Sequence, residues 1–218
     1  MSVVLLAGAS FKIATAYGAV KAMSSLSNAA SAVAALASGH NVAPNDFCEL
    51  TTGWELQNGR LAMATAVAGD NVTFGKINTQ NLQMHPAGSS AGSVREISTW
   101  TPLSQITPQF SISGGEQNYA DATFVSHLIK QRIPTDRNPI NITLPYFFDL
   151  SLPWVDQVVQ IAESATPAGF RMDLRNGNII VANAYWSIRE FPTAEDGTLR
   201  GQIDLSLVGS GTMYAGLV

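Results

Sequence analysis

The sequence is poor in cysteine and in charged residues, and both scarcities limit what the protein can be. Its 218 residues include a single cysteine, Cys48, which cannot form a disulfide within the chain, so nothing requires an oxidising compartment. We expect Cys48 to be a small buried apolar residue. Charged residues make up 13% of the chain, about half of the roughly 25% usual in soluble domains. This indicates either buried subunit interfaces or a surface of neutral polar side chains.

Basic clusters and long apolar runs are also missing. The formal net charge is −4 and no group of Lys and Arg stands together, which argues against a protein that grips nucleic acid. No segment approaches the roughly 18 apolar residues of a transmembrane span, so no membrane partner is expected. The apolar opening, residues 1–10, has no basic residue before it, so we expect no signal peptide and synthesis in the cytosol.

The sequence shows no set of residues spaced to bind a metal or a cofactor. His40, His85 and His127 stand far apart, without Cys or carboxylate at ligand spacing, so no metal site is predicted. The glycine-rich residues 209–216 precede no helix, which removes the helix-terminus dipole that a phosphate loop uses. They are predicted to form a C-terminal strand and tail, and no cofactor is expected.

One motif resembles a catalytic one. Gly88 to Gly92 match the Gly-x-Ser-x-Gly nucleophile elbow of hydrolases, which would make Ser90 the nucleophile and His127 its base. That elbow needs a strand before it and a helix after it, whereas Pro86 precedes the glycines and a strand-like segment follows. We therefore interpret the motif as a linker and predict no catalytic residue. A hydrolase using Ser90 is kept as a minor alternative.

What the sequence does contain is a series of strand and turn signals. Phe170, Met172 and Leu174 alternate with polar residues up to Asn176-Gly177, which predicts a hairpin closed by a two-residue turn with positive backbone angles. Residues 178–191 are its returning strand. Similar patterns predict strands at 93–101, 106–113, 123–133, 139–147 and 202–207, the last after an Asp196-Gly197 turn. Phe11, Ile13, Thr15 and Tyr17 lie on one side of a possible strand, and residues 27–38 are interpreted as a strand, although alanine also permits a helix in both segments. Residues 45–81 carry short apolar stretches between turns, typical of a small β-barrel-like module.

One segment breaks the β pattern. Residues 152–165 place Trp154, Val158 and Ile161 at helical spacing after Pro153, a residue suited to a first helical turn. The four tryptophans are expected to anchor the core or an interface, because stacking on bases would need a basic groove beside them. They are Trp54, Trp100, Trp154 and Trp186.

Several short motifs, in their order along the chain, give it a resemblance to the tail tube proteins (major tail proteins) of long-tailed bacteriophages. In the first half they are Ser27-Asn28-Ala29, Glu49 to Trp54, Leu56 to Arg60 and Thr73-Phe74. In the second half they are Gly88 with Gly92 to Arg95, Ser113 to Gln117, Gln131 to Thr135, the helix near 153–165, Leu174 to Asn178, Asn183 to Tyr185, and Pro192-Thr193. The resemblance covers most of the chain.

The resemblance implies a mainly β fold: a tail-tube-type β-sandwich or barrel with one flanking α-helix and a small inserted β module. It divides the chain into an N-terminal strand region of the core (1–26), the inserted module (27–81), a Gly/Ser linker (82–92) and the tail-tube core (93–218). The inserted module is expected on the outside of the tube. Gly114, Gly115, Glu116 and Gln117, in the loop after the second core strand, are candidates for contacts between rings.

The function implied is structural. Hexameric rings would stack into a tube in the virion tail, built in the host cytoplasm, with no turnover chemistry. The partners implied are further copies of the chain, tail-terminator, tape-measure and baseplate proteins, and DNA that passes without being held. Two alternatives stay open: a terminator or baseplate ring on the same fold, and a soluble β-rich module that binds a carbohydrate or peptide.

Overall fold

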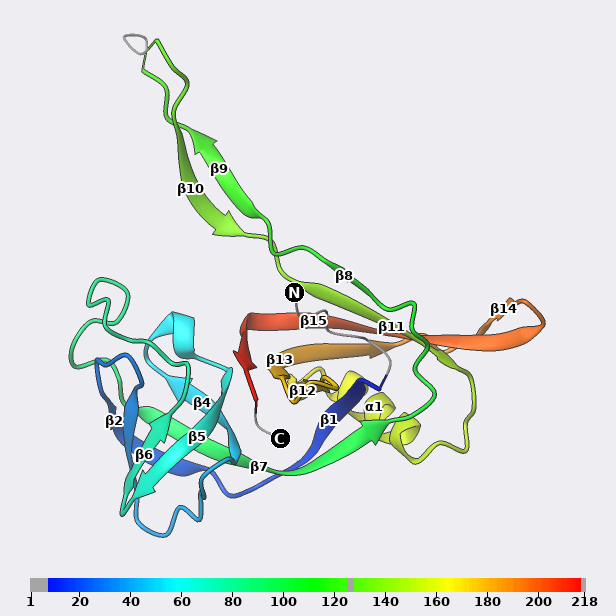
Figure 1. Ribbon diagram of the computed structural model, residues 1–218, viewed down its shortest axis with the longest axis horizontal. Helices are drawn as coiled ribbons and strands as arrows, with labels where there is room; N and C mark the ends of the chain where they lie inside the picture. Colours follow the sequence, from blue (N-terminus) through cyan, green and yellow to red (C-terminus); the bar gives the residue numbers. More distant parts are fainter. Residues whose placement is uncertain (1–7, 125–127, 217–218) are drawn as a thin grey trace.

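The computed structural model of the chain describes residues 8–124 and 128–216, and these residues form two units that share one long strand (Figure 1). The smaller unit contains β2 (Lys21–Leu26), β3 (Val33–Leu36), β4 (Phe47–Thr52), β5 (Arg60–Ala68) and β6 (Asn71–Phe74), with the short 3-10 helix η1 (Glu55–Gln57). The larger unit contains β1 (Ser10–Tyr17), β8 (Ser111–Ser113), β11 (Asn141–Phe147), α1 (Pro153–Ser164), β12 (Ala168–Asp173), β13 (Ile179–Ile188), β14 (Thr193–Glu195) and β15 (Thr198–Tyr214). The shared strand is β7 (Gly92–Leu103).

The smaller unit is a closed barrel. Its strands pair in the order β2-β3-β6-β5-β4-β7, and β7 pairs back with β2 to complete the circle. Closure leaves the barrel without a free sheet edge and encloses an apolar interior, in which Leu50, Phe74 and Cys48 are fully buried. The predicted burial of Cys48 is therefore confirmed. The barrel includes residues 45–81, where a β-barrel-like module was expected, but it also takes in β2, β3 and β7. Burial raises the pKa of the Cys48 thiol, so it stays protonated.

The larger unit is an open, curved sheet with the helix on one face. The strand order is β7-β1-β12-β13-β15-β11-β8, antiparallel throughout. Helix α1 begins at Pro153 and ends where Ala165 takes a left-handed conformation, so the predicted helix is confirmed. Trp154 and Val158 pack from the helix into the main core together with Trp186 of β13. The predicted mainly β fold with one flanking helix is thus confirmed.

The division into domains at residues 26, 81 and 92 stays a prediction. In the structure β2 pairs within the small barrel, and β7 continues from the barrel into the larger sheet without a break. The segment before β7 is tied down by packing: His85 is buried, its ring lies 5.1 Å from that of Trp54, and the Trp54 indole donates to the Pro86 carbonyl (2.9 Å).

Two strand predictions and one turn prediction were wrong. The strand expected at 106–113 is reduced to β8, and the strand expected at 123–133 is displaced: β9 (Gln117–Asp121) ends before it and β10 (Arg132–Arg137) begins at its end. The hairpin at Asn176-Gly177 is present, but only Gly177 has positive φ (79°). Its amide donates to the Leu174 carbonyl (2.9 Å), which makes the loop longer than the two-residue turn predicted.

Candidate assembly surfaces

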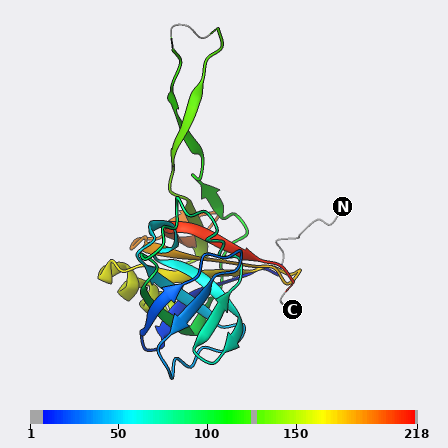
Figure 2. The same cartoon turned by 90° about the vertical axis from the view of Figure 1, so that its left-hand side faces the viewer.

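The most conspicuous surface feature is an arm made of β9 and β10, which extends from the edge of the larger sheet away from both units (Figures 1 and 2). Among the described residues these two strands pair only with each other. A lone two-stranded hairpin is marginally stable in water at best. The arm therefore lacks the packing that would normally hold such a hairpin.

The arm also exposes large apolar side chains. Tyr119 and Ile133 are each 58% exposed, and Phe124, Leu128 and Ile129 near the tip are exposed as well. Tyr119 lies opposite Pro134 and Ile133 opposite Ala120 in the ladder, so the two exposed residues project from opposite faces of the ribbon. Each face of the ribbon therefore carries an apolar side chain. A face that stays in contact with water would be polar throughout. His127 lies outside the described residues.

The four residues predicted to contact other rings form the root of this arm. Gly114 and Gly115 both have positive φ, and a Cβ on Gly114 would lie 1.9 Å from the Pro139 carbonyl oxygen. Only glycine fits there, so the pair sets the direction in which the arm leaves the sheet. Glu116 is exposed, while Gln117 is half-buried and accepts a hydrogen bond from Arg137 (3.1 Å). Their role between rings stays a prediction.

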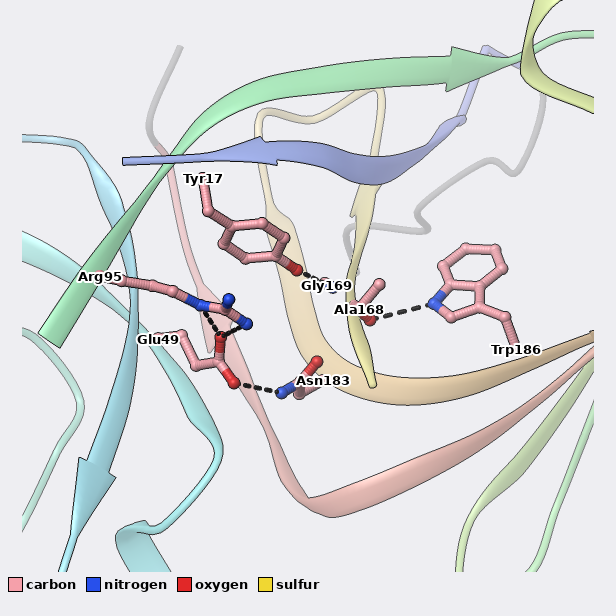
Figure 3. Close-up of polar contacts among 7 residues, drawn as sticks. All are labelled: Tyr17, Glu49, Arg95, Ala168, Gly169, Asn183 and Trp186. Carbon is pink, nitrogen blue, oxygen red and sulfur yellow. Dashed lines mark hydrogen bonds and ion pairs between the residues drawn. The ribbon is translucent and has the colours of Figure 1, made fainter. Parts of the chain in front are cut away.

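A second feature is the joint between the small barrel and the larger sheet, built around Glu49 (Figure 3). Glu49 of β4 is only 9% exposed, and both its carboxylate oxygens are used. Arg95 of β7 donates to Oε2 through Nε (2.7 Å), and Asn183 of β13 donates to Oε1 through Nδ2 (3.0 Å). The Arg95 guanidinium also lies over the ring of Tyr17, 3.9 Å from its centroid. Four strands from the two units are thus held by one polar cluster.

Tyr17 extends the joint to β12. Its hydroxyl oxygen accepts from the Gly169 amide (2.9 Å), and burial raises the pKa of the phenol, so it stays protonated. A neighbouring apolar cluster packs barrel residues Phe47, Leu61 and Met63 against Val181 and Tyr214 of the sheet. The oxygen Oδ1 of Asn183 is buried without a hydrogen-bond partner in the part of the chain that is described. The barrel is therefore fixed to the sheet by packing as well as by the polar cluster.

A third surface is the face of β11, β15 and β13 that points away from α1. On β15, residues Ile203 and Leu205 enter the core, so their neighbours Gln202 and Asp204 lie on the opposite face. Thr143 of β11 and Gln202 both donate to the Asp204 carboxylate (2.7 and 2.8 Å). Asn141, Tyr185, Ser187 and Ser206 add neutral polar groups to this face. Arg200 of β15 also lies on it, two residues before Gln202, and forms an ion pair with Glu195.

The Gly88 to Gly92 motif does not form the nucleophile elbow that the hydrolase alternative requires. Ser90 is followed by β7, not by a helix, so the strand-turn-helix arrangement that exposes a hydrolase nucleophile is not formed. No three His, Cys, Asp or Glu side chains within residues 8–124 and 128–216 are grouped to hold a metal ion. No helix in those same ranges is long and apolar enough to cross a membrane. Trp54, Trp154 and Trp186 are buried and Trp100 is half-buried against Phe47, so core packing accounts for them.

An open sheet, an unpacked arm and an uncovered polar face are features of a subunit that is completed by assembly. A family model described as "Phage tail tube protein, TTP" matches residues 52–216 of the chain. The chain therefore belongs to the phage tail tube protein family. The predicted resemblance is confirmed by this match.

Comparison with solved structures gives weaker similarities. A chain of the anti-feeding prophage baseplate aligns with 56% of this chain and 88% of its own length, at 11% identity and a TM-score of 0.38. A chain of the tube-terminating cap of the same particle aligns with 55% of this chain and 84% of its own, at 16% identity and a TM-score of 0.37. A chain of an extracellular contractile injection system, from a structure of its sheath-tube complex in the extended state, aligns with 49% of this chain and 80% of its own length. Its sequence identity is 16% and its TM-score is 0.35. No curated protein matches the sequence.

Proposed function

We propose that the chain assembles with itself into hexameric rings that stack into the tube of a phage tail, through which DNA passes. The arm is the observation that carries this proposal. Its strands pair only with each other in the described chain, and it exposes Tyr119 and Ile133 on opposite faces. Burying that apolar surface against a neighbouring copy would supply the packing that the arm lacks, at about 25 cal/mol for each Å² removed from water.

Contact between rings is assigned to the arm and its root. Gly114 and Gly115 aim the arm, and Glu116 is the exposed polar group at its base. Within a ring, sheet pairing is the natural contact, because β8 is paired on one side only, with β11, among the described strands. A second copy that pairs with this edge would continue the sheet from subunit to subunit and enclose a lumen.

The uncovered polar face is assigned to that lumen. It lies opposite α1 and presents mainly neutral hydroxyl and amide groups, together with the Asp204 carboxylate and the Arg200 guanidinium, which is paired with Glu195. DNA that must slide needs a wall that makes no lasting phosphate contacts, and a neutral or weakly acidic wall meets that need. The lumen-facing charge is therefore part of the function.

The remaining partners follow from this role. A tube needs a baseplate at one end, a terminator at the other and a tape-measure protein to set its length, and these are proposed as binding partners. Assembly would take place in the host cytoplasm and the product would lie in the virion tail. No turnover chemistry is proposed, since assembly is driven by burial of apolar surface and by strand pairing.

Negative-stain electron microscopy over a concentration series tests the proposal. The wild-type chain is compared with Ile133→Ser, which removes an apolar side chain from the arm, and with Val20→Ser, which removes one of similar exposure (62%) outside it. Tubes with a regular repeat are expected from the wild type and Val20→Ser, and dispersed protein from Ile133→Ser. Tubes formed equally well by Ile133→Ser would refute the role of the arm. Closed rings that do not extend would favour a terminator or baseplate part instead.

A further inference from the structure

A cleft lies where the small barrel meets the end of β15, away from the joint at Glu49. It has a volume of about 430 Å³, and Arg60 is the single charged residue in its lining. Arg60 extends from β5, and its guanidinium is held by two neutral acceptors. Nε donates to Thr212 Oγ1 (3.1 Å) and Nη1 to Gln57 Oε1 (3.3 Å). No carboxylate in the described ranges forms an ion pair with Arg60.

The position of the guanidinium is fixed by a chain of hydrogen bonds behind it. His85 pairs through Nε2 with the side-chain nitrogen of Gln57 (3.0 Å), which leaves the Gln57 oxygen facing Arg60. Thr212 in turn donates to the Leu61 carbonyl (3.1 Å), so its own oxygen is available to Arg60 Nε. Gln57, His85 and Thr212 are all buried. The guanidinium is thus held in position at the cleft by neutral groups.

Burial of this cation is costly, and the cost is visible in its pKa. Desolvation lowers the pKa of Arg60 from its usual value, with the nearby Tyr214 hydroxyl opposing the shift. A partly buried charge without a counter-ion is unfavourable unless something else binds it. A carboxylate in the cleft would form a charge-assisted hydrogen bond with the fork of the guanidinium.

The rest of the lining points to a ligand that also carries hydroxyl groups. Asn78, Gln80, Asn81 and Ser210 bring neutral amides and a hydroxyl, groups that both donate and accept, as sugar hydroxyls do. The carboxylate of a single Asp or Glu side chain would engage Arg60 and leave most of these groups unused. We propose that the cleft around Arg60 binds a sugar that carries a carboxylate, of the uronic acid class.

Isothermal titration of the chain with glucuronate, and with glucose as the neutral match, tests this proposal. Because Arg60 contributes to the fold through Thr212, the test leaves Arg60 unchanged and alters Ser210, which is exposed on β15. Ser210→Glu places a tethered carboxylate in the cleft, and Ser210→Gln is its uncharged match. Glucuronate is expected to bind the wild type and Ser210→Gln at least about tenfold more tightly than it binds Ser210→Glu. In Ser210→Glu the tethered carboxylate would take the place of the glucuronate carboxylate in the charged hydrogen bond to Arg60.

The outcomes separate the proposal from its alternatives. Glucuronate binding that weakens with added salt, while glucose fails to bind, supports the proposal. Equal binding of glucuronate and glucose overturns it, because Arg60 would then have no part in recognition. No glucuronate binding also overturns it. A higher melting temperature for Ser210→Glu than for Ser210→Gln would then assign the cleft to an acidic side chain of another protein. The cleft lies outside the arm and the polar face, so tube formation can fail or succeed independently.

Discussion

Removing the charge of Glu49 while keeping its shape is expected to destabilise the protein by about 2 kcal/mol. Breaking a buried ion pair from one side costs about 3–5 kcal/mol. The Arg95 side chain is 35% exposed, so water can compensate part of its lost partner and the expected cost lies below that range. Glu49→Gln keeps the volume and an acceptor for Asn183 but turns an amide N–H or a neutral oxygen toward the guanidinium. For a chain of this size that loss corresponds to a fall in melting temperature of about 4–8 °C.

The measurement is chemical and thermal denaturation of the unassembled protein, followed by circular dichroism and tryptophan fluorescence. The control is Glu190→Gln, which removes the same charge from an exposed side chain that belongs to none of the ion pairs in the described ranges. Surface substitutions of this kind change stability little, so the control should lie within about 0.5 kcal/mol of the wild type. Equal stability of the two variants would refute the view that the Glu49 cluster holds barrel and sheet together.

Three further predictions follow from the described contacts. Asp204→Lys in assembled particles should slow DNA ejection at low salt relative to Asp204→Asn, because a lysine in the lumen would bind DNA phosphates. Equal ejection rates for the two variants would count against the assignment of this face to the lumen. Cys48 should resist iodoacetamide at pH 8 until the protein is unfolded, because burial raises the pKa of its thiol and the thiolate is the reactive form; rapid alkylation of the folded chain would contradict this. Gly201→Ala should lower the free energy of unfolding by about 1–3 kcal/mol in a denaturation assay, since the new Cβ would lie 2.3 Å from the buried ring of Tyr146. Gly39→Ala is the control: its Cβ meets no atom within 4 Å, and only the positive φ of Gly39 opposes the substitution.

The elements that local sequence could predict are those whose signal lies within a few residues. Helix α1 was predicted because Pro153 and the spacing of Trp154 and Val158 are local signals, and they agree with the packing. The hairpin at Asn176-Gly177 was predicted for the same reason. Its turn type was not, because Gly177 alone can supply the positive φ when the loop is longer.

The arm was missed because its composition misled the prediction. The apolar residues between 123 and 133 have high strand propensity, and a single strand was expected there. Strand pairing instead joins Gln117–Asp121 with Arg132–Arg137, which are polar for the most part, and leaves apolar residues near the tip exposed. Pro134 is tolerated in β10 because a two-stranded ribbon has free edges. Strand propensity reflects burial of apolar residues against neighbouring strands, and the apolar residues near the tip of the arm have no such burial within the described chain.

The joint and the Arg60 cleft could not be predicted from sequence spacing, because each brings together residues from distant segments. Glu49 and Asn183 lie 134 positions apart, and Arg60 and Thr212 lie 152 apart. None of these residues belongs to a recognisable motif for a polar cluster. Only the three-dimensional pairing of β4 with β7 and the packing of β5 near β15 place them side by side.

The connection between the small barrel and the sheet bears on how the Arg60 cleft would be presented in an assembled tube. β7 runs through both units, and the Glu49 cluster fixes their contact, so every copy presents the cleft in the same orientation. A tube repeats its subunits at fixed intervals, so a polymeric uronic acid could engage several clefts at once. Linked sites bind more tightly than single ones by about 10²–10⁴ when their geometry permits it, without any new contact. The tube is therefore expected to bind a polymeric uronic acid more tightly than the isolated chain binds glucuronate.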